Sequence, residues 1–215
     1  MELDSEETMC GSLRLIFGPM FAGKSSLTNA ELIKQNELGA RVLKIVHAAD
    51  RQRTGTVRNV VEQGTTHNAG FGLLPESITV ISALELRSLD VAPFQFIGVD
   101  EGQFFTDILE VVPYWVDRLG KHVIVSALDG DTNRNPFGDG QVLRLIPHAN
   151  KITKLNAHCK FCIEEQRRFS NHCDINNFQA PFTVRLVSNS DQVYIGGSES
   201  FAAACRYHHR QLQGK

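Results

Sequence analysis

A glycine-rich segment near the N-terminus has the residue types and spacing that suit phosphate binding. The letters GPMFAGKS at 18–25 follow the apolar run Leu13–Phe17 and open a segment with helical character. They fit G-x-x-x-x-G-K-[ST], in which backbone N–H groups at a helix N-terminus surround phosphate oxygens. Lys24 would then reach the β- and γ-phosphates, and the Ser25 hydroxyl would bind Mg²⁺. The motif predicts that ATP·Mg²⁺ is bound by Gly18, Pro19, Met20, Phe21, Ala22, Gly23, Lys24 and Ser25.

Two adjacent carboxylates, Asp100 and Glu101, come directly after the apolar run Phe94–Val99. This is the carboxyl end of an expected buried strand, where open α/β sheets bind their ligands. We expect Asp100 to hold Mg²⁺ through water and Glu101 to act as general base toward the attacking nucleophile. ATP hydrolases carry the same pair, with the glutamate orienting water. The pair by itself therefore leaves a kinase and an ATPase open.

The C-terminal third contains four residues suited to a metal ion, in the pattern C-x₂-C followed by C-x₂-H. They are Cys159, Cys162, Cys205 and His208. Three thiolates and an imidazole are typical of tetrahedral Zn²⁺, and a site with no open position is structural. Cys173 and His209 are alternative ligands, and reduced thiols without a metal are the competing interpretation.

The elements that must position these residues alternate between strands and helices. Strands are expected at Leu13–Phe17, Arg41–His47, Thr79–Ile81, Phe94–Val99 and Lys121–Ala127, and helices at Lys24–Leu38, Ser82–Leu89 and Asp107–Leu119. This alternation is typical of a mostly parallel sheet in an α/β protein. Ser82 and Glu85 have the spacing of a capping box, and Pro113 should kink its helix or move the start of that helix.

The chain divides into three expected parts: a disordered acidic tail over 1–12, a P-loop α/β domain over 13–150 and a small zinc-bound subdomain over 151–210. Within the last part we expect short strands at Thr183–Val187 and Gln192–Ile195 and a helix near Ser198–Arg206.

The composition of the 215 residues is that of a globular protein, with 42% hydrophobic residues and a net charge of −2. That balance gives no general attraction to nucleic acid or to an acidic membrane. The N-terminus has no secretory pattern, and no apolar stretch approaches the roughly 20 residues that cross a bilayer. We expect a cytoplasmic protein with a small-molecule substrate.

Taken together, the motifs resemble those of the type II thymidine kinase family. GPMFAGKS at 18–25 and IGVDEGQFF at 97–105 carry the resemblance, with ALDG at 127–130, PFG at 136–138, the Cys-x₂-Cys pair and IGG at 195–197. The resemblance implies phosphorylation of a pyrimidine deoxynucleoside at its 5′-hydroxyl, with Glu101 as base. It also implies that Asp50 lies near the phosphates, that Arg51 or Arg53 assists phosphoryl transfer, and that the protein is a homo-oligomer, a tetramer in this family.

The family's base pocket is apolar and is closed by a lasso-shaped loop that the zinc site would clamp. The resemblance implies base contacts from Met20, Phe104, Leu128, Thr132, Phe137, Gln192, Tyr194, Gly196 and Phe201. Some positions depart from the family pattern: Thr132 replaces an aromatic residue, Phe201 replaces a tyrosine, and Gln192 and Tyr194 replace small apolar residues. Thymidine is the expected substrate, with deoxyuridine or a broader pyrimidine range as alternatives.

Two further functions compete with this interpretation. The altered pocket would also suit a P-loop ATPase or regulatory nucleotide-binding protein that has lost nucleoside kinase activity. The zinc subdomain, with Arg167, Arg168 and Arg185, could instead form a nucleic-acid-binding ribbon. The net charge of −2 argues against the ribbon.

Overall fold

A six-stranded sheet forms the centre of the protein, in the order β3-β2-β4-β5-β1-β6. The computed structural model describes residues 10–48, 74–169, 178–188 and 196–213, with only the backbone of 167–169. The strands are β1 Ser12–Phe17, β2 Val42–His47, β3 Thr79–Ala83, β4 Phe96–Val99, β5 His122–Ala127 and β6 Lys151–Lys154. Every neighbouring pair in this sheet is parallel. The α/β class with a mostly parallel sheet is therefore confirmed.

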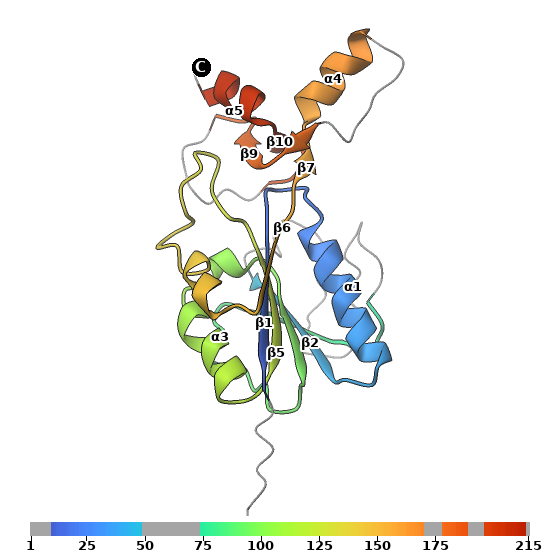
Figure 1. Ribbon diagram of the computed structural model, residues 1–215, viewed down its shortest axis with the longest axis vertical. Coiled ribbons are helices and arrows are strands. Elements are labelled where there is room, and N and C mark those ends of the chain that lie inside the picture. The colour runs from blue at the N-terminus through green and yellow to red at the C-terminus, as the bar shows by residue number, and fades with distance from the viewer. Residues whose placement is uncertain (1–9, 49–73, 170–177, 189–195, 214–215) are drawn as a thin grey trace, which may run out of the picture.

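Helices cover both faces of the sheet, as parallel strands with two buried faces require. Helix α1, Lys24–Glu37, lies on one face, and α3, Ile108–Asp117, lies on the other with the 3₁₀ helix η3, Leu143–His148 (Figure 1). Gly39 follows α1 with φ +93°, the left-handed conformation that favours glycine at helix ends. Helix α3 begins at Ile108 and runs on through Pro113.

The main hydrophobic core lies between the sheet and α3. It includes Leu15, Val99 and Val125 from the strands and Trp115 from α3. On the other face Leu32 of α1 packs with Val42 and Ile78. A Cβ added to Gly98 of β4 would lie 2.7 Å from Leu32 Cδ1, so a glycine here lets α1 approach the sheet closely.

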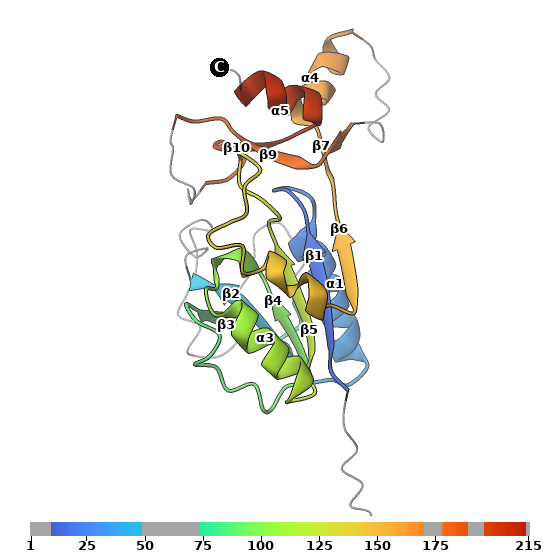
Figure 2. The same ribbon diagram turned by 60° about the vertical axis from the view of Figure 1, so that its left-hand side comes forward.

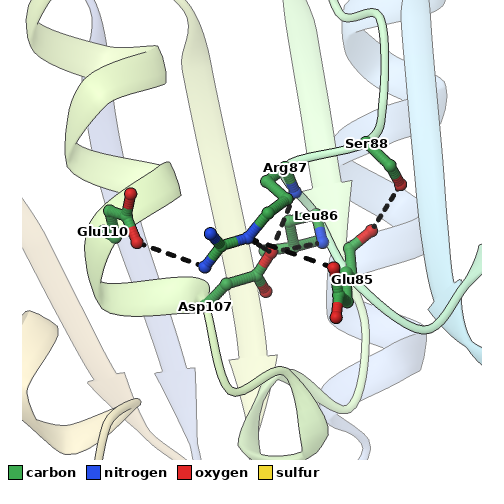
Figure 3. Close-up of polar contacts among 6 residues, drawn as sticks. All are labelled: Glu85, Leu86, Arg87, Ser88, Asp107 and Glu110. Carbon is green, nitrogen blue, oxygen red and sulfur yellow. Dashed lines mark hydrogen bonds and ion pairs between the residues drawn. The ribbon is translucent and has the colours of Figure 1, made fainter.

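The helix expected at Ser82–Leu89 is wrong, because Ser82 and Ala83 complete β3 and turns follow. Asp107 Oδ2 accepts hydrogen bonds from the backbone N–H groups of Leu86 at 2.8 Å and Arg87 at 2.9 Å (Figure 3). The Glu85 carboxylate lies 4.0 Å from Arg87 Nε. Asp107, which is distant in sequence, thus accepts the backbone hydrogen bonds of this segment, and the helix that the capping-box pattern predicts does not form.

The C-terminal part forms a separate layer above the carboxyl ends of the strands (Figures 1 and 2). Its elements are β7 Ala157–His158, α4 Lys160–Phe169, β8 Gln179–Ala180, β9 Phe182–Arg185, β10 Phe201–Ala204 and α5 Arg206–Gln213. Strands β7 and β8 pair antiparallel, as do β9 and β10. The parallel sheet continues to Lys154, since β6 pairs with β1.

The strand expected at Thr183–Val187 is confirmed as β9, whereas the helix expected near Ser198–Arg206 is wrong. Phe201–Ala204 is strand β10, paired with β9 in a register that sets Phe201 opposite Arg185, and the helix begins at Arg206. Pairing with β9 and burial of the whole FAAA segment outweigh the helix propensity of alanine. The strand expected at Gln192–Ile195 lies outside the residues that the structure describes, so it stays a prediction.

Candidate active site and metal centre

The glycine-rich segment forms the turn between β1 and α1. Gly18 has φ +151°, and a Cβ there would lie 2.6 Å from the carbonyl oxygen of Leu155. Gly23 is the N-cap of α1 with φ +82°, and Phe21 also has a positive φ, +65°. Lys24 is buried and its Nζ donates to the carbonyl of Pro19 at 2.8 Å. The backbone is thus held in a compact loop at a helix N-terminus, which is the geometry that suits phosphate.

Asp100 lies at the carboxyl end of β4, and hydroxyl groups from two other elements converge on it. Strand β5 separates β4 from β1, so Asp100 meets the loop across the end of that strand. Ser126 of β5 donates to Asp100 Oδ1 at 2.7 Å, and Ser25 of α1 donates to the same oxygen at 3.1 Å. The structure therefore brings the two predicted Mg²⁺ residues together and adds Ser126 between them.

A fully buried lysine compensates the charge of Asp100. Lys44 of β2 is 1% exposed, and its Nζ lies 3.4 Å from Asp100 Oδ2 and donates to Asn29 Oδ1 at 2.8 Å. Burial alone would raise the pKa of Asp100, but Lys44 and the two serine hydroxyls outweigh it and hold the pKa below its ordinary value. Asp100 is consequently an anion at neutral pH although it is 6% exposed.

Glu101 adopts a left-handed backbone conformation, with φ 53° and ψ 44°, and starts the 3₁₀ helix η2, Gly102–Phe104. A Cβ on Gly102 would lie 2.6 Å from Val125 Cγ1, so this turn packs directly on β5. The Gln103 amide donates to Glu101 Oε2 at 2.6 Å and accepts from the backbone N–H of Leu128 at 3.0 Å. The Glu101 carboxylate is thereby held by a side chain of its own turn.

Some of the residues expected in a base pocket do come together. The rings of Phe104 and Phe137 meet edge to face at 6.1 Å, and His47 lies 5.5 Å from Phe104. The backbone N–H of Met20 donates to Thr183 Oγ1 at 3.0 Å, which joins the glycine-rich loop to β9. Phe201 is buried in β10, where Arg185 lies over its ring.

Of the remaining residues expected in the base pocket, Leu128, Thr132 and Gly196 are described, whereas Gln192 and Tyr194 are not. The carbonyl of Thr132 accepts hydrogen bonds from His209 Nε2 at 2.9 Å and Gln213 Nε2 at 2.8 Å, so it anchors the loop after β5 to α5. Gly196 is partly buried ahead of β10. Asp50, Arg51, Arg53, Cys173, Gln192 and Tyr194 lie outside the described residues.

The cysteine and histidine pairs converge on one point in the C-terminal layer. The ligand atoms of Cys159, Cys162, Cys205 and His208 all lie within 4.8 Å of one another. Cys162 Sγ is 3.8 Å from Cys205 Sγ, and His208 Nδ1 is 3.3–3.6 Å from the three sulfur atoms. Bonds of the usual length in a tetrahedral zinc site would place sulfurs about 3.8 Å apart and nitrogen about 3.6 Å from sulfur. The four residues therefore fit a tetrahedral ion.

The charges around this cluster also favour a cation. Burial and the neighbouring Cys159 thiol raise the pKa of Cys162 to about 12, so the thiols compete for ionisation. Burial opposes ionisation of Cys205 too, but hydrogen bonds from the backbone and ring of His208 lower its pKa to about 7. Glu165 Oε1 lies 3.0 Å from His208 Nε2, which leaves Nδ1 facing the sulfurs. His209 bonds Thr132 instead, and the cluster forms without it.

Comparison with known proteins identifies the family. The sequence profile described as Thymidine kinase matches residues 11–209. The chain belongs to the thymidine kinase family. It is 31% identical to a thymidine kinase of Oryza sativa subsp. japonica over 96% of this chain and 69% of that protein. It is 33% identical to the thymidine kinase of Monkeypox virus over 91% of this chain and 95% of that protein.

Membership of the thymidine kinase family makes the chain an enzyme, a nucleotide-binding kinase. A solved structure, domain III of the Thermotoga maritima replication initiation protein DnaA, gives a TM-score of 0.36 at 18% identity over 66% of this chain and 54% of that one, too low to bear on the fold. Within the described residues, no helix is both long and apolar enough to span a membrane.

Residues that the sequence analysis missed at these sites include Lys44, Gln103, Glu165 and Ser126, and three of these four had a faint signal in the sequence. Lys44 is a charged residue with apolar neighbours on both sides in β2. Gln103 follows the acidic pair by two residues, and Glu165 follows Cys162 by three, one helical turn. Ser126 is a hydroxyl in a buried strand and had no signal beyond that.

Proposed function

We propose that this enzyme transfers the γ-phosphate of ATP to the 5′-hydroxyl of thymidine or a related pyrimidine deoxynucleoside, with Glu101 as general base. The observation that carries the proposal is the position of Glu101. It directly follows Asp100, which is bonded to Ser25 of the phosphate-binding motif, and its carboxylate is fixed by Gln103. The thymidine kinase relatives supply the expected acceptor.

In the proposed reaction the nucleoside 5′-oxygen gives its proton to the Glu101 carboxylate and forms a new bond to the γ-phosphorus. The bond between that phosphorus and the β,γ-bridging oxygen breaks, so ADP leaves with those electrons. Glu101 then releases the proton to water. A carboxylate with this role typically contributes 10²- to 10⁴-fold in rate.

The phosphate-binding loop and the polar cluster behind it would hold the nucleotide. Backbone N–H groups of Gly18–Ser25 and the Lys24 ammonium would contact the phosphates, and Ser25 and Asp100 would hold Mg²⁺ directly or through water. The ion, when bound, neutralises charge on the phosphate oxygens. Asp50 and one of Arg51 or Arg53 remain proposed contributors that fall outside the described residues.

The pocket for the base would be formed where the sheet domain meets the C-terminal layer. Phe104 and Phe137 provide a paired aromatic wall, and an apolar wall suits a flat pyrimidine. We propose further contacts from Met20, Leu128, Thr132, Gly196 and Phe201 and from the undescribed Gln192 and Tyr194. The Cys159, Cys162, Cys205 and His208 cluster would hold a structural Zn²⁺ that stabilises this layer.

The proposal is tested by incubating the purified protein with ATP·Mg²⁺ and a panel of nucleosides and identifying the products. We expect thymidine 5′-monophosphate, and Glu101→Gln should lower kcat by at least about 100-fold while ATP still binds. Glu37→Gln, at an exposed position in α1, is the matched control. Near-normal turnover by Glu101→Gln would contradict the role of this residue. ATP hydrolysis with no phosphorylated nucleoside would favour the alternative, an ATPase or regulatory nucleotide-binding protein.

A further inference from the structure

The side-chain amide of Gln103 joins Glu101 to the segment that follows β5. It lies in the middle of η2, with Glu101 two residues before it and Leu128 directly after the end of β5. Its amide nitrogen lies 2.6 Å from Glu101 Oε2, and its amide oxygen lies 3.0 Å from the backbone nitrogen of Leu128.

The direction of these hydrogen bonds is fixed by chemistry. The backbone N–H of Leu128 can only donate, so the amide oxygen of Gln103 must face it. The NH₂ group then faces Glu101, and an ionised carboxylate can only accept. Glutamine satisfies both neighbours at once. A glutamate at 103 would satisfy Leu128 but set an oxygen against Glu101, and a lysine would satisfy Glu101 alone.

The backbone around Gln103 makes this orientation rigid. The turn is left-handed at Glu101, Phe104 N–H donates to the Glu101 carbonyl at 3.0 Å, and Gly102 packs against Val125 with no space for a side chain. A non-glycine residue in the left-handed region persists only where its surroundings determine it, and such residues gather at functional sites. The backbone leaves the side-chain torsions of Glu101 free, and the hydrogen bond from the Gln103 amide restrains where its carboxylate lies.

We propose that Gln103 is a positioning residue that orients the Glu101 carboxylate for proton removal and couples it to the loop after β5. This inference rests on the proposed role of Glu101 as general base. A neutral amide suits this role because its hydrogen bond orients the carboxylate. A cation at the same place would make the carboxylate a weaker base, because it stabilises the ionised form more strongly. The same loop begins at Leu128 and carries Phe137, which meets Phe104. The same turn thus holds both Glu101, the proposed general base, and Phe104, part of the aromatic wall of the pocket.

The test compares Gln103→Met, which has similar length but makes neither hydrogen bond, with Gln103→Glu, which keeps the acceptor for Leu128. Steady-state kinetics with thymidine and ATP·Mg²⁺ would be measured across pH. For Gln103→Met we expect kcat to fall roughly 10- to 100-fold, as misplacement of a reacting group does, with KM for ATP within about twofold. The acid limb of its kcat profile should move to higher pH, because the ionised carboxylate has lost a donor.

Gln103→Glu separates orientation from folding. Two carboxyl groups at this distance share one proton, and the second ionises at a higher pH than a single carboxyl group would. We therefore expect kcat to decline above the pH range in which the wild type gains activity, because Glu101 then loses its donor and faces a second negative charge. Gln35→Met and Gln35→Glu, at a glutamine of α1, should leave both kcat and its pH profile unchanged. If Gln103→Met retains kcat within twofold, or Gln103→Glu keeps the wild-type pH profile, the inference is overturned.

Glu101→Gln and the double variant Glu101→Gln/Gln103→Met distinguish this inference from the proposed function. If Gln103 acts through Glu101, the double variant should be no slower than Glu101→Gln alone. Losses that multiply would overturn the positioning role while leaving Glu101 as base. If Glu101→Gln itself turns over normally, the proposed function fails first, and the inference falls with it.

Discussion

The protein contains two polar clusters in which buried negative charge must be compensated, and the source of the compensating positive charge differs between them. In the sheet domain, the Asp100 cluster places one carboxylate among Lys44, Ser25 and Ser126, so the chain itself supplies the opposite charge. In the C-terminal layer, the metal cluster places Cys159, Cys162 and Cys205 around His208, with Glu165 as a further acid behind the imidazole. The thiols of this cluster must lose their protons to become metal ligands, so the compensating positive charge would come from the ion.

The hydrophobic cores beside the two clusters also differ in size. The Asp100 cluster lies at the edge of the main core, which extends through strands and α3. The metal cluster is packed against a small group centred on Ala157, Ala180 and Ala203. Alanines bury little apolar area, so this layer has less hydrophobic stabilisation of its own. We infer that the sheet domain folds on its internal charges and core, whereas the C-terminal layer depends on an ion from outside.

Removing a metal ligand should have the largest effect. For Cys162→Ser we expect the bound metal to be lost and amide hydrogen exchange across residues 157–169 and 178–185 to accelerate by at least about 100-fold, because binding energy at such a site is folding energy. Strands β1, β4 and β5 should keep their protection. Metal analysis and hydrogen-exchange mass spectrometry measure both results. Cys10→Ser, an exposed thiol outside the cluster, is the control. Equal loss of protection in the sheet would contradict the division between the two regions.

Removing the internal cation should have the next largest effect. Lys44→Met leaves Asp100 buried without its partner, and breaking a buried pair typically costs about 3 kcal/mol or more. Urea unfolding at pH 7 measures this loss. Lys151→Met, at an exposed lysine of β6, is the control and should change stability little. A loss no larger than that of the control would show that Lys44 does not stabilise the cluster.

The same variant should also change the pH dependence of stability. In the wild type the pKa of Asp100 lies below its ordinary value, so its ionisation stabilises the fold above that value and the contribution is lost as pH falls through the folded pKa. Without Lys44, less of the effect of burial is offset, so the pKa of Asp100 should rise. The stability deficit of Lys44→Met should therefore be greatest at neutral pH and shrink as pH falls through the raised pKa of Asp100 in the variant. A deficit that grows on acidification would contradict this assignment.

Motifs in which neighbouring residues do the chemistry were readable from the sequence. The loop at 18–25, the acidic pair and the two metal-binding pairs have fixed spacings, and apolar runs gave the parallel sheet. Asp100 and Ser25 could be paired because parallel strands end at one edge of a sheet.

What depends on contacts between distant segments could not be read in this way. The helix expected at Ser82–Leu89 failed because Asp107 takes the N–H groups of the turn, and no local pattern contains that contact. The alanines of β10 favour a helix until β9 is beside them. Lys44 was not predicted as part of the site, because its partner Asp100 follows β4 and is far from Lys44 in the sequence. The link between Thr132 and α5 joins residues far apart in the chain and had no local signal either.

The smallest effect in this comparison should come from Glu165, which contacts the metal cluster only through His208. Its carboxylate accepts from Nε2 and so keeps Nδ1 toward the sulfurs. Partners of this kind typically change metal affinity by 10- to 100-fold, and because Glu165 is 60% exposed we expect Glu165→Gln to weaken zinc binding by about tenfold. Competition with a chromophoric chelator near pH 7.5 measures the affinity, and Glu164→Gln, at a neighbouring acid of α4, is the matched control. If Glu165→Gln binds zinc as tightly as the wild type, the orientation of His208 is set by its own backbone contact with Cys205, where the N–H lies 3.5 Å from the sulfur. The metal cluster would then orient His208 without help from the Glu165 carboxylate, through contacts among the ligands themselves.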